Sequence, residues 1–282
     1  MLPDEALIKG IIEAALAEDV GSGDITTSLT VPEGAISRAV ISAREDGIIA
    51  GIDIARMVFA TLDPCVHFEN KVKDGDKVSK GQIIAAIEGR SRSLLMGERV
   101  ALNFLQRLSG VATRTTRFVS LVTGTHAQIT DTRKTTPGLR ALEKYAVTVG
   151  GGRNHRFGLY DGILIKDNHI AAAGGVAKAV QAAKNSVSRK LPIEVEVRTL
   201  DELTEAIDAG ADSVLLDNMD IETMRQAVKI AAGHVKIEAS GGVNEENVAA
   251  IAATGVDFVS VGALTHSVKA LDIGMDFVIR EA

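Results

Sequence analysis

The segment DTRKTTPGLRALEKY, residues 131–145, places Arg133 and Lys134 side by side shortly before a proline. The whole chain is acidic, with a formal net charge of −6, yet residues 131–169 hold seven Lys or Arg against four acids. These cations lie among glycine, asparagine and proline, which differs from the solvated face of a charged helix. Guanidinium and ammonium groups bind carboxylates and phosphates. The segment therefore predicts an anion-binding site.

The full cationic group is too large for a single phosphate. It comprises Arg133, Lys134, His155, Arg156 and Lys166. Because arginine forks suit planar carboxylates, we expect a second, separate anion that carries carboxylate groups. Lys166 has an alternative interpretation as the Schiff-base lysine of a barrel aldolase, which requires an uncharged amine. The residues alone leave both roles of Lys166 open.

Two carboxylates, Glu196 and Asp217, end predicted strands and have no cation directly beside them in the sequence. Carboxylate oxygens suit Mg²⁺ that is held mainly by substrate oxygens. The alternative is a buried pair of acids in salt bridges with Lys166 or Arg133, and both arrangements can occur in different states. No spacing of Cys or His resembles a zinc site, and the sequence contains neither a Walker motif nor a nucleophile elbow.

Two glycine-containing turns follow predicted strands late in the chain. EASGGVNEEN, residues 238–247, joins a strand to the beginning of a helix, where unpaired N–H groups and the helix dipole favour an anion. VGALTHS, residues 261–267, follows the next strand. The late loops of βα barrels often bind phosphate, so the two turns together predict a phosphate clamp.

Repeated strand, turn and helix segments from residue 125 onward must position these groups. Short apolar segments such as GILIKDN, IEVEV, SVLLDN and VKIEASGG lack strict alternation, which is typical of parallel strands covered on both faces. At intervals of 30, 21, 23 and 22 residues, successive segments end in Lys166, Glu196, Asp217, Ser240 and Gly262. In a βα barrel the carboxyl ends of the strands share one face, so we expect these residues to meet there. An open doubly wound sheet is the alternative arrangement.

The first third of the chain has a different pattern. Residues 4–18 carry apolar residues on one side of a predicted helix, and residues 36–90 contain short β-rich runs separated by glycine turns. Residues 93–122 contain few helix breakers and predict one or two helices that link this small sheet to the later repeats. VKDGDKVSKGQIIAAIEG also has the rhythm of biotinyl and lipoyl domains, so a carrier or binding module is an alternative class.

Composition and length limit the function classes. The 282 residues suggest two domains or one large domain, with 46% hydrophobic and 24% charged residues as in ordinary globular proteins. No apolar run reaches the roughly 18 residues that indicate a membrane span, and the acidic N-terminal segment lacks the features of an export signal. The single Cys65 fits a reduced cytoplasm, and the negative net charge argues against a general nucleic-acid binder. We therefore expect a cytoplasmic protein with neither a membrane nor a nucleic-acid partner.

Several of these motifs resemble one family. The motifs that carry the resemblance are DTRKTTPGLRALEKYAV, GGGRNHRFGLYDGILIKDNHI, VEVRTLDE, LLDN and EASGGV, with GDITT at 23–27 and ERVALNFLQRLSGVAT at 98–113. The chain closely resembles the quinolinate phosphoribosyltransferases, also called carboxylating nicotinate-nucleotide pyrophosphorylases. The resemblance implies an α/β protein with two domains. The first is an N-terminal α/β sandwich, hammerhead-like, at 1–108, to which residues 267–282 return. The second is an open seven-stranded α/β barrel at 109–266.

The resemblance also implies a reaction with Mg²⁺ as the cofactor. Phosphoribosyl pyrophosphate (PRPP) and quinolinate, a pyridine dicarboxylate, give nicotinate mononucleotide, pyrophosphate and carbon dioxide in de novo NAD biosynthesis. The implied catalytic residues are Lys134, Lys166, Glu196 and Asp217, with the two acids at the ribose hydroxyls and the metal. The implied substrate-binding residues are Arg99, Thr132, Arg133, Lys134, His155, Arg156, Lys166, Glu196, Asp217, Ser240, Gly241, Gly242, Val261, Gly262 and Ala263.

Assembly and the nearest rival follow from the same resemblance. It implies a homodimer with shared active sites, in which Arg99 reaches into the site of the neighbouring subunit, and it leaves open whether dimers form hexamers. A molybdenum-associated paralogue of the family shares the fold and is the nearest enzymatic rival. The intact motifs RKTTPG, NHR and LIKDNH favour the phosphoribosyltransferase over that paralogue.

Overall fold

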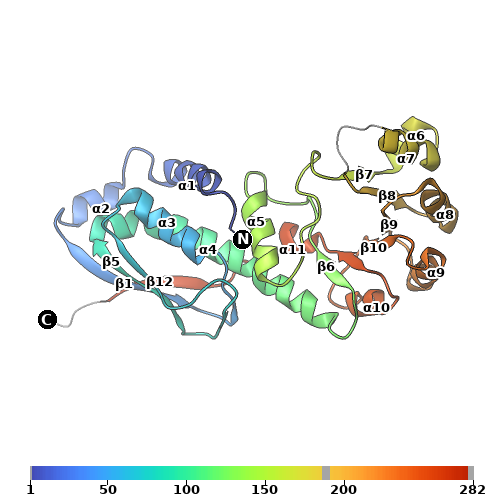
Figure 1. Ribbon diagram of the computed structural model, residues 1–282. Helices are drawn as coiled ribbons and strands as arrows, with labels where there is room; N and C mark the ends of the chain where they lie inside the picture. The colour runs from blue at the N-terminus through green and yellow to red at the C-terminus, as the bar shows by residue number, and fades with distance from the viewer. Residues whose placement is uncertain (1, 186–190, 279–282) are drawn as a thin grey trace. The chain divides into compact units, whose positions relative to one another are not determined.

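The computed structural model describes residues 2–185 and 191–278, and the chain divides into two units (Figure 1). Unit 1 comprises the described residues of Met1–Thr116, Thr136–Gly151 and Val268–Ala282, and unit 2 those of Arg117–Thr135 and Gly152–Ser267. The predicted boundary between residues 108 and 109 falls inside one continuous helix, α4 (Ser91–Leu121). Residues 279–282 of the predicted returning segment lie outside the described residues.

Unit 1 contains an antiparallel sheet of four strands in the order β12-β1-β5-β3. The central strand β1 pairs with β12 on one side and with β5 on the other, and β3 pairs with the far side of β5. A separate two-stranded pair is formed by β2 and β4. Because β12 pairs with β1, the last described part of the chain returns to the N-terminal sheet. The strands of unit 1 are β1 (Ile36–Ala43), β2 (Gly47–Ile48), β3 (His67–Asn70), β4 (Lys77–Val78), β5 (Ile83–Arg90) and β12 (Ile273–Phe277).

Helix α1 of unit 1 buries one apolar side. In α1, residues Ile8, Ile12 and Leu16 recur every four residues and are all buried, as the one-sided pattern of residues 4–18 predicts. The carboxylate of Asp4 caps this helix by accepting the N–H of Ala6 at 3.0 Å. Besides α4, the helices of unit 1 are α1 (Glu5–Val20), α2 (Ile25–Thr30), α3 (Ile52–Leu62) and α5 (Arg140–Val149).

A buried ion pair fixes the segment that follows the Arg133–Lys134 motif. Glu143 in α5 is fully buried, and its Oε1 accepts from the Arg107 guanidinium of α4 at 2.8 Å. The same oxygen accepts from the Thr136 hydroxyl at 2.8 Å, and Oε2 accepts the Thr136 N–H at 3.0 Å. Since a buried carboxylate is costly unless its oxygens are paired, this network holds Thr136 in a defined position.

Unit 2 is a parallel sheet of six strands in the order β6-β11-β10-β9-β8-β7. Each pair of neighbours in this order is parallel, so all six strands run in one direction. Parallel pairing requires a crossover between consecutive strands, and helices supply it here. The strands are β6 (Gln128–Thr130), β7 (Ile163–Ile165), β8 (Ile193–Val197), β9 (Ser213–Asp217), β10 (Lys236–Ser240) and β11 (Phe258–Ser260).

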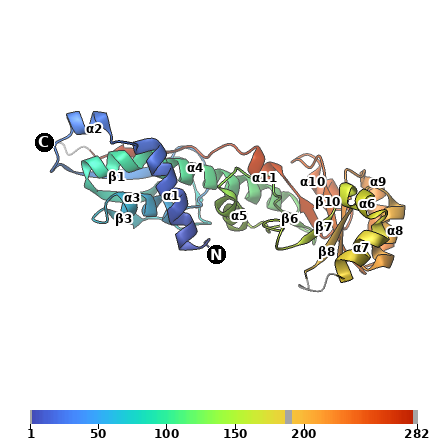
Figure 2. The same ribbon diagram turned by 90° about the horizontal axis from the view of Figure 1, so that it is seen from above.

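The helices of unit 2 follow the strands in the expected alternation. Figures 1 and 2 show α7, α8 and α9 along the outer side of strands β8, β9 and β10. The Thr199 hydroxyl caps the beginning of α8 by accepting the Glu202 N–H at 3.1 Å, and the helix ends at Gly210 with a φ of 81°. The helices are α6 (Asp167–Ala173), α7 (Val176–Asn185), α8 (Leu200–Ala209), α9 (Ile221–Ala231), α10 (Val248–Ala252) and α11 (Ala263–His266).

The α/β fold with an open barrel is confirmed, but the sheet has six strands in the described residues where seven were implied. The seventh place, beside β6, is taken by a single-residue bridge between Arg153 and Thr130. Arg153 donates its N–H to the Ile129 carbonyl at 2.8 Å and accepts the Asp131 N–H at 3.1 Å. The chain therefore runs along β6 for one residue and then leaves it.

No helix in the described part of the chain combines the length and the hydropathy needed to cross a membrane.

Candidate active site

A cavity of about 780 Å³ opens at the carboxyl ends of the unit 2 strands, and we call it the mouth cavity. Lys166 follows β7 directly, Asp217 and Ser240 are the last residues of β9 and β10, and Glu196 is the last but one of β8. Because the strands are parallel, these ends lie at the same edge of the sheet. The strand-end residues therefore meet in the mouth cavity, as the sequence predicts.

Thirteen of the fifteen predicted site residues line the mouth cavity. They come from the carboxyl ends of the strands, from the loops that follow them, and from the segment after the bridge to β6. The thirteen are Thr132, Arg133, Lys134, His155, Arg156, Lys166, Glu196, Asp217, Ser240, Gly241, Gly242, Gly262 and Ala263.

The other two predicted residues lie elsewhere. Arg99 is an exposed residue of α4 in unit 1. Val261 is 1% exposed, and its side chain does not reach the mouth cavity as the structure describes it. Its N–H donates to the Thr130 carbonyl at 2.9 Å, so Val261 extends the pairing of β11 with β6. Val261 therefore positions the turn that contains Gly262.

Glu196 and Asp217, two of the three acids that line the mouth cavity, are both paired with cations. Lys166 Nζ lies 2.8 Å from Glu196 Oε2, which is the salt bridge that the sequence left as an alternative. Asp217 Oδ2 lies 3.4 Å from Arg198 Nε, and its Oδ1 accepts from the Asn218 amide at 2.9 Å. Arg198 was missed from the sequence because it pairs across strands with an acid 19 residues away. The Lys166 amine is thus engaged in an ion pair instead of standing free for attack on a carbonyl.

The glycine turn after β10 closely approaches the turn after β9. Gly241 has a φ of 97°, and a Cβ there would lie 2.2 Å from Oδ1 of Asn218. Gly242 also has a positive φ, of 60°. Only glycine combines this backbone conformation with this approach, so the pair of glycines places main-chain groups at the cavity edge.

The Arg133–Lys134 loop is fixed by hydroxyl groups. The Thr132 hydroxyl accepts the Lys134 N–H at 3.1 Å, and the Thr265 hydroxyl donates to the Lys134 carbonyl at 2.8 Å. Lys134 Cδ also lies 3.2 Å from the position of a Cβ on Gly262, so that glycine leaves room for the lysine side chain. The backbone that carries the two cations is therefore held on both sides.

The guanidinium of Arg156 lies in a crowded cationic region. Burial lowers the pKa of Arg156, and the nearby charge of Arg133 lowers it further, while Glu194 and Asp161 act in the opposite direction. Arg156 also donates to the Gly162 carbonyl at 3.2 Å. The two guanidiniums repel each other, which favours an anion between or beside them.

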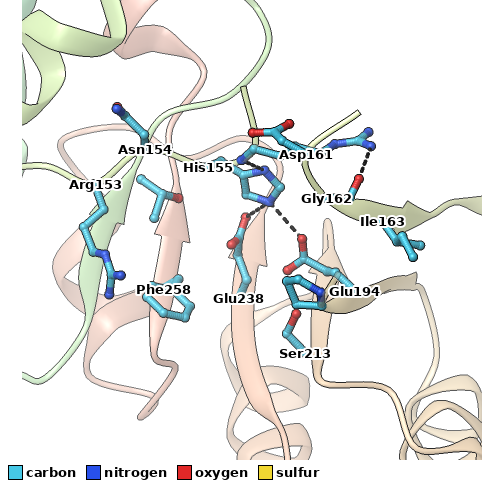
Figure 3. A pocket seen from close by; sticks show the side chains of 13 residues that line it. Arg153, Asn154, His155, Asp161, Gly162, Ile163, Glu194, Ser213, Glu238 and Phe258 are labelled. Carbon is cyan, nitrogen blue, oxygen red and sulfur yellow. Dashed lines mark hydrogen bonds and ion pairs between the residues drawn. The ribbon is translucent and has the colours of Figure 1, made fainter. Parts of the chain in front are cut away.

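A second, smaller cavity of about 230 Å³, the inner cavity, contains acids that the sequence analysis missed (Figure 3). It reaches Ile163, Ser213 and Phe258, which are the first residues of their strands. Glu194 and Glu238 project into it from β8 and β10. Each glutamate stands two residues before a predicted site residue on the same strand, Glu196 or Ser240. The period of two in a strand was the signal that would have found them.

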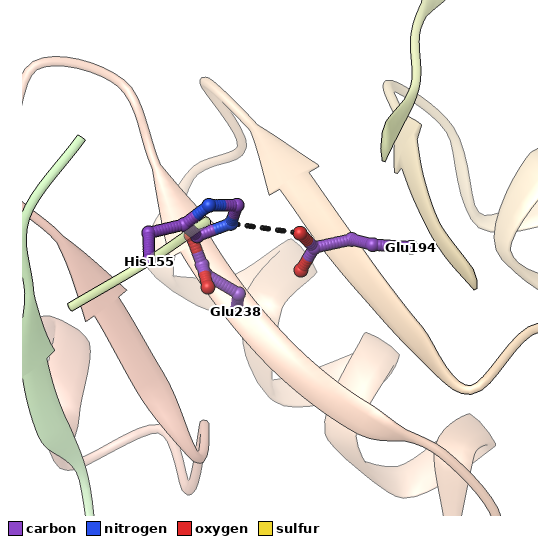
Figure 4. A group of neighbouring side chains, drawn as sticks. All are labelled: His155, Glu194 and Glu238. Carbon is purple, nitrogen blue, oxygen red and sulfur yellow. Dashed lines mark hydrogen bonds and ion pairs between the residues drawn. The ribbon is translucent and has the colours of Figure 1, made fainter. Parts of the chain in front are cut away.

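His155, Glu194 and Glu238 form a compact cluster (Figure 4). His155 Nε2 lies 2.8 Å from Glu194 Oε2 and 3.7 Å from Glu238 Oε1. Glu238 also accepts from the Ser260 hydroxyl. Burial and the charge of Glu194 raise the pKa of Glu238 to about 7, although His155 opposes the shift. One acid of the pair therefore retains a proton below neutral pH.

The cluster has the residue types of a metal site, but its hydrogen bonds do not fit one. His155 Nδ1 accepts the Arg156 N–H at 2.8 Å. A neutral histidine that binds a metal through Nε2 carries its proton on Nδ1. That proton would point at the Arg156 N–H, and two donors cannot form a hydrogen bond with each other. The carboxylates that suit a hard cation are instead Glu196 and Asp217, in the mouth cavity.

His169 is a helix cap in this structure. Its Nδ1 accepts the Lys166 N–H at 2.9 Å, which closes the first turn of α6. The structure therefore assigns the His169 ring to the beginning of the helix.

Two family models match the chain in succession. The N-terminal domain of quinolinate phosphoribosyl transferase matches residues 24–109, and the C-terminal domain of the same enzyme matches residues 111–276. A probable carboxylating nicotinate-nucleotide pyrophosphorylase of Bacillus subtilis is 47% identical over 272 residues, which are 96% of this chain and 94% of the relative. A decarboxylating quinolinate phosphoribosyltransferase of Nicotiana glauca is 45% identical over 95% of this chain and 81% of the relative.

Solved structures agree with these matches over nearly the whole chain. The nicotinate-nucleotide pyrophosphorylase of Francisella tularensis has a TM-score of 0.94 and 44% identity, covering 98% of this chain and 97% of that one. The NadC protein of Streptococcus pyogenes also has a TM-score of 0.94, with 42% identity, and covers 99% of this chain and 100% of that one.

The burial of Glu238 predicts that the stability of the protein depends on pH. Its pKa rises from the ordinary value of 4.5 to about 7, so the folded state keeps a proton that the unfolded state releases. The stability from this proton is fully present below about pH 4.5 and is lost as the pH rises through about 7. We expect Glu238→Gln, which cannot ionise, to raise the melting temperature relative to the unsubstituted protein at pH 8 but not at pH 5.

Calorimetry at the two pH values measures this difference. Glu222→Gln is the matched control, because the Glu222 side chain is 67% exposed and forms only a surface pair with Arg225. The control should change the melting temperature equally at both pH values. An equal effect of Glu238→Gln at pH 5 and pH 8 would contradict the prediction.

Proposed function

The chain belongs to the quinolinate phosphoribosyltransferase family, and we propose on that premise that it transfers the phosphoribosyl group of PRPP to quinolinate. The products are nicotinate mononucleotide, pyrophosphate and carbon dioxide, so the enzyme is a decarboxylating pentosyltransferase of NAD biosynthesis. The main support is the mouth cavity, which has cations and carboxylates on facing loops. Two anionic reactants and one transient cation need such a combination.

Quinolinate binds at the cationic side of the mouth cavity in this proposal. Arg133, Lys134, Arg156 and Lys166 line that side, and His155 lies beside them. Guanidinium forks form paired hydrogen bonds with carboxylates, and the two carboxylates of quinolinate relieve the repulsion between Arg133 and Arg156. The charge and planarity of this side match a pyridine dicarboxylate.

The acidic side supports the transfer itself. The pyridine nitrogen attacks the anomeric carbon of the ribose while the bond to pyrophosphate breaks, and positive charge develops on the sugar. Glu196 and Asp217 are placed to bind the ribose hydroxyls and to stabilise that charge. The quaternised ring then accepts the electron pair of the bond to the 2-carboxylate, carbon dioxide leaves, and a proton adds to the ring carbon. Holding both reactants in line can lower the barrier by roughly 7 to 11 kcal/mol.

Mg²⁺ fits the donor chemistry of the same side. Glu196 and Asp217 offer the carboxylate oxygens that a hard cation takes, and they would hold it together with oxygens of PRPP. When bound, Mg²⁺ supplies positive charge to the leaving pyrophosphate. Lys166 and Arg198 pair with these acids and keep both carboxylates oriented.

The two late glycine turns form the phosphate side. Main-chain N–H groups of Gly241 and Gly242, with the turn of Gly262 and Ala263, are placed to bind the 5-phosphate of PRPP. The phosphate would thereby fix the ribose between the acids and the quinolinate ring.

The proposal extends to assembly and location. A homodimer with shared sites would bring Arg99, an exposed residue of unit 1, to the quinolinate side of a neighbouring subunit. Such dimers could further assemble into hexamers. A reduced cytoplasm is the proposed location, in keeping with the single Cys65.

A product assay tests the proposed reaction directly. We expect the purified protein to form nicotinate mononucleotide and carbon dioxide from quinolinate and PRPP with Mg²⁺, and to lose this activity when a chelator replaces Mg²⁺. Chromatography of the nucleotide and release of labelled carbon dioxide measure the two products. Absence of product with quinolinate, together with turnover of another aromatic anion, would favour the molybdenum-associated paralogue.

Substitution of Arg133 tests the cationic side. We expect Arg133→Ala to raise KM for quinolinate by about 10- to 100-fold, because a charge-assisted hydrogen bond is lost. The melting temperature should change little, since the removed side chain belongs to the cavity. Steady-state kinetics and calorimetry measure both effects, with Arg225→Ala as the control for removal of an arginine from unit 2 outside the mouth cavity. Unchanged kinetics of Arg133→Ala would overturn the assignment of this side.

Hybrid dimers test the proposed role of Arg99. At a quinolinate concentration far below the raised KM of Arg133→Ala, the Arg99→Ala and Arg133→Ala chains should each show little activity. If Arg99 serves the partner's site, a mixture of the two should regain activity, because one site of a mixed dimer contains both arginines. Subunit exchange is confirmed by native mass spectrometry. Complete absence of rescue after confirmed exchange would count against a shared site.

A further inference from the structure

Glu194 has no place in the proposed reaction, yet it is one of the few buried acids of unit 2. It is 9% exposed and lines the inner cavity, and it does not line the mouth cavity as the structure describes it. Its Oε2 lies 2.8 Å from His155 Nε2, and the His155 ring lines both cavities (Figure 4). Any influence of Glu194 on the substrates must therefore pass through neighbouring protein groups.

The hydrogen bonds of His155 fix its tautomer. Nδ1 accepts the main-chain N–H of Arg156 at 2.8 Å, so Nδ1 carries no proton. The proton is on Nε2, and Nε2–H donates to Glu194. A carboxylate that accepts from one ring nitrogen selects this tautomer and orients the ring. Both nitrogens of His155 are thus engaged with protein groups.

Only one acid of the cluster lies within hydrogen-bond distance of His155 Nε2. Glu238 is 3% exposed, lies 3.7 Å from Nε2 and accepts from the Ser260 hydroxyl. Two adjacent buried carboxylates cannot both ionise without a large cost, and the pKa of Glu238 is raised to about 7. Glu194, at 2.8 Å, is therefore the acceptor of the Nε2 proton, while Glu238 lies beyond hydrogen-bond distance.

The His155 ring in turn fixes the main chain that carries Arg156. Asp131, which is fully buried, accepts the His155 N–H at 2.9 Å. The ring accepts the next N–H along the chain, that of Arg156. These two bonds hold successive peptide groups just past the point where Arg153 leaves the side of β6. No ladder of strand hydrogen bonds holds residues 154–156 in the described structure.

We propose that Glu194 is a positioning residue for the binding of quinolinate: its carboxylate holds His155 in the Nε2–H tautomer, and the ring then fixes the main chain of Arg156. The proposal deepens the proposed function and rests on it, because quinolinate is the ligand of Arg156 there. Glu194 touches no substrate. Removing its acceptor should make the orientation of the Arg156 guanidinium less defined, while Asp217 and the two glycine turns on the PRPP side keep their geometry.

Kinetics of two variants test this role. We expect Glu194→Ala to raise KM for quinolinate about tenfold or more, with KM for PRPP and kcat changed less than about threefold. Glu194→Gln keeps an amide oxygen as the acceptor and should restore KM for quinolinate to within about threefold of the unsubstituted value. Ser213→Ala, which removes a hydroxyl from the same inner cavity away from His155, is the matched control and should change neither KM.

The tautomer itself is measured without any substrate. Nitrogen chemical shifts of ¹⁵N-histidine-labelled protein distinguish the two neutral tautomers, and the His155 signals are identified by their loss in His155→Asn. We expect the Nε2–H form in the unsubstituted protein and in Glu194→Gln, and a mixture of forms in Glu194→Ala. If Glu194→Ala folds poorly, the tautomer is still measured in the unsubstituted protein and in Glu194→Gln, and both should show the Nε2–H form.

Several outcomes overturn the proposal. An Nδ1–H or doubly protonated His155 in the unsubstituted protein at neutral pH would do so, as would an unchanged KM for quinolinate in Glu194→Ala. Equal increases of both KM values, or a Glu194→Gln variant as impaired as Glu194→Ala, would also contradict it. If the unsubstituted protein does not convert quinolinate at all, the proposed function fails, and the tautomer measurement still shows whether Glu194 orients His155.

Discussion

The parallel direction of the six strands in unit 2 is the constraint on which the candidate site depends. A strand alternates its side chains between two faces, so residues two apart on one strand point the same way. Glu194 and Glu196 on β8, and Glu238 and Ser240 on β10, are such pairs. Because every strand runs in the same direction, the later member of each pair lines the mouth cavity and the earlier one lines the inner cavity, with Glu238 lining both. The pairing register of the strands therefore fixes the positions of both sets of side chains.

Charge balance is the second requirement on this arrangement. Several cations lie close together in a chain whose net charge is negative, and each brings a cost of repulsion and lost hydration. The structure offsets the cost locally: Glu196 pairs with Lys166, Asp217 pairs with Arg198, and Glu194 acts on Arg156 from below. In the proposed reaction, anionic substrates add to these pairings. The pairs thus keep Lys166 and Arg198 oriented.

The sequence predicted most of the mouth cavity because strand ends recur at nearly constant intervals, and each interval is one strand plus one helix. It could not predict Arg198, whose pairing with Asp217 depends on which strands are neighbours. Val261 was included with its flanking motif, although its side chain faces the core and only its main chain contributes. Glu194 and Glu238 were passed over because the prediction considered only the strand ends, although the period of two places each on the same face as a predicted site residue. Their roles become visible only when the strands are assembled and the His155 ring is found between them.

The described residues form no seventh strand, so the segment after Arg153 is held by side chains instead of strand hydrogen bonds. A strand in a sheet is held by main-chain hydrogen bonds, which tolerate most side-chain substitutions. Here one residue bridges to β6, and the next peptide groups are held by the carboxylate of Asp131 and the ring of His155. The geometry of this segment consequently depends on particular side chains and on where their protons lie. A substitution in β9 or β10 affects the hydrogen bonds of the whole sheet. A substitution of Asp131 or His155 instead affects the position of Arg156. An open barrel therefore leaves one part of its site adjustable by side-chain chemistry while the rest is fixed by the sheet.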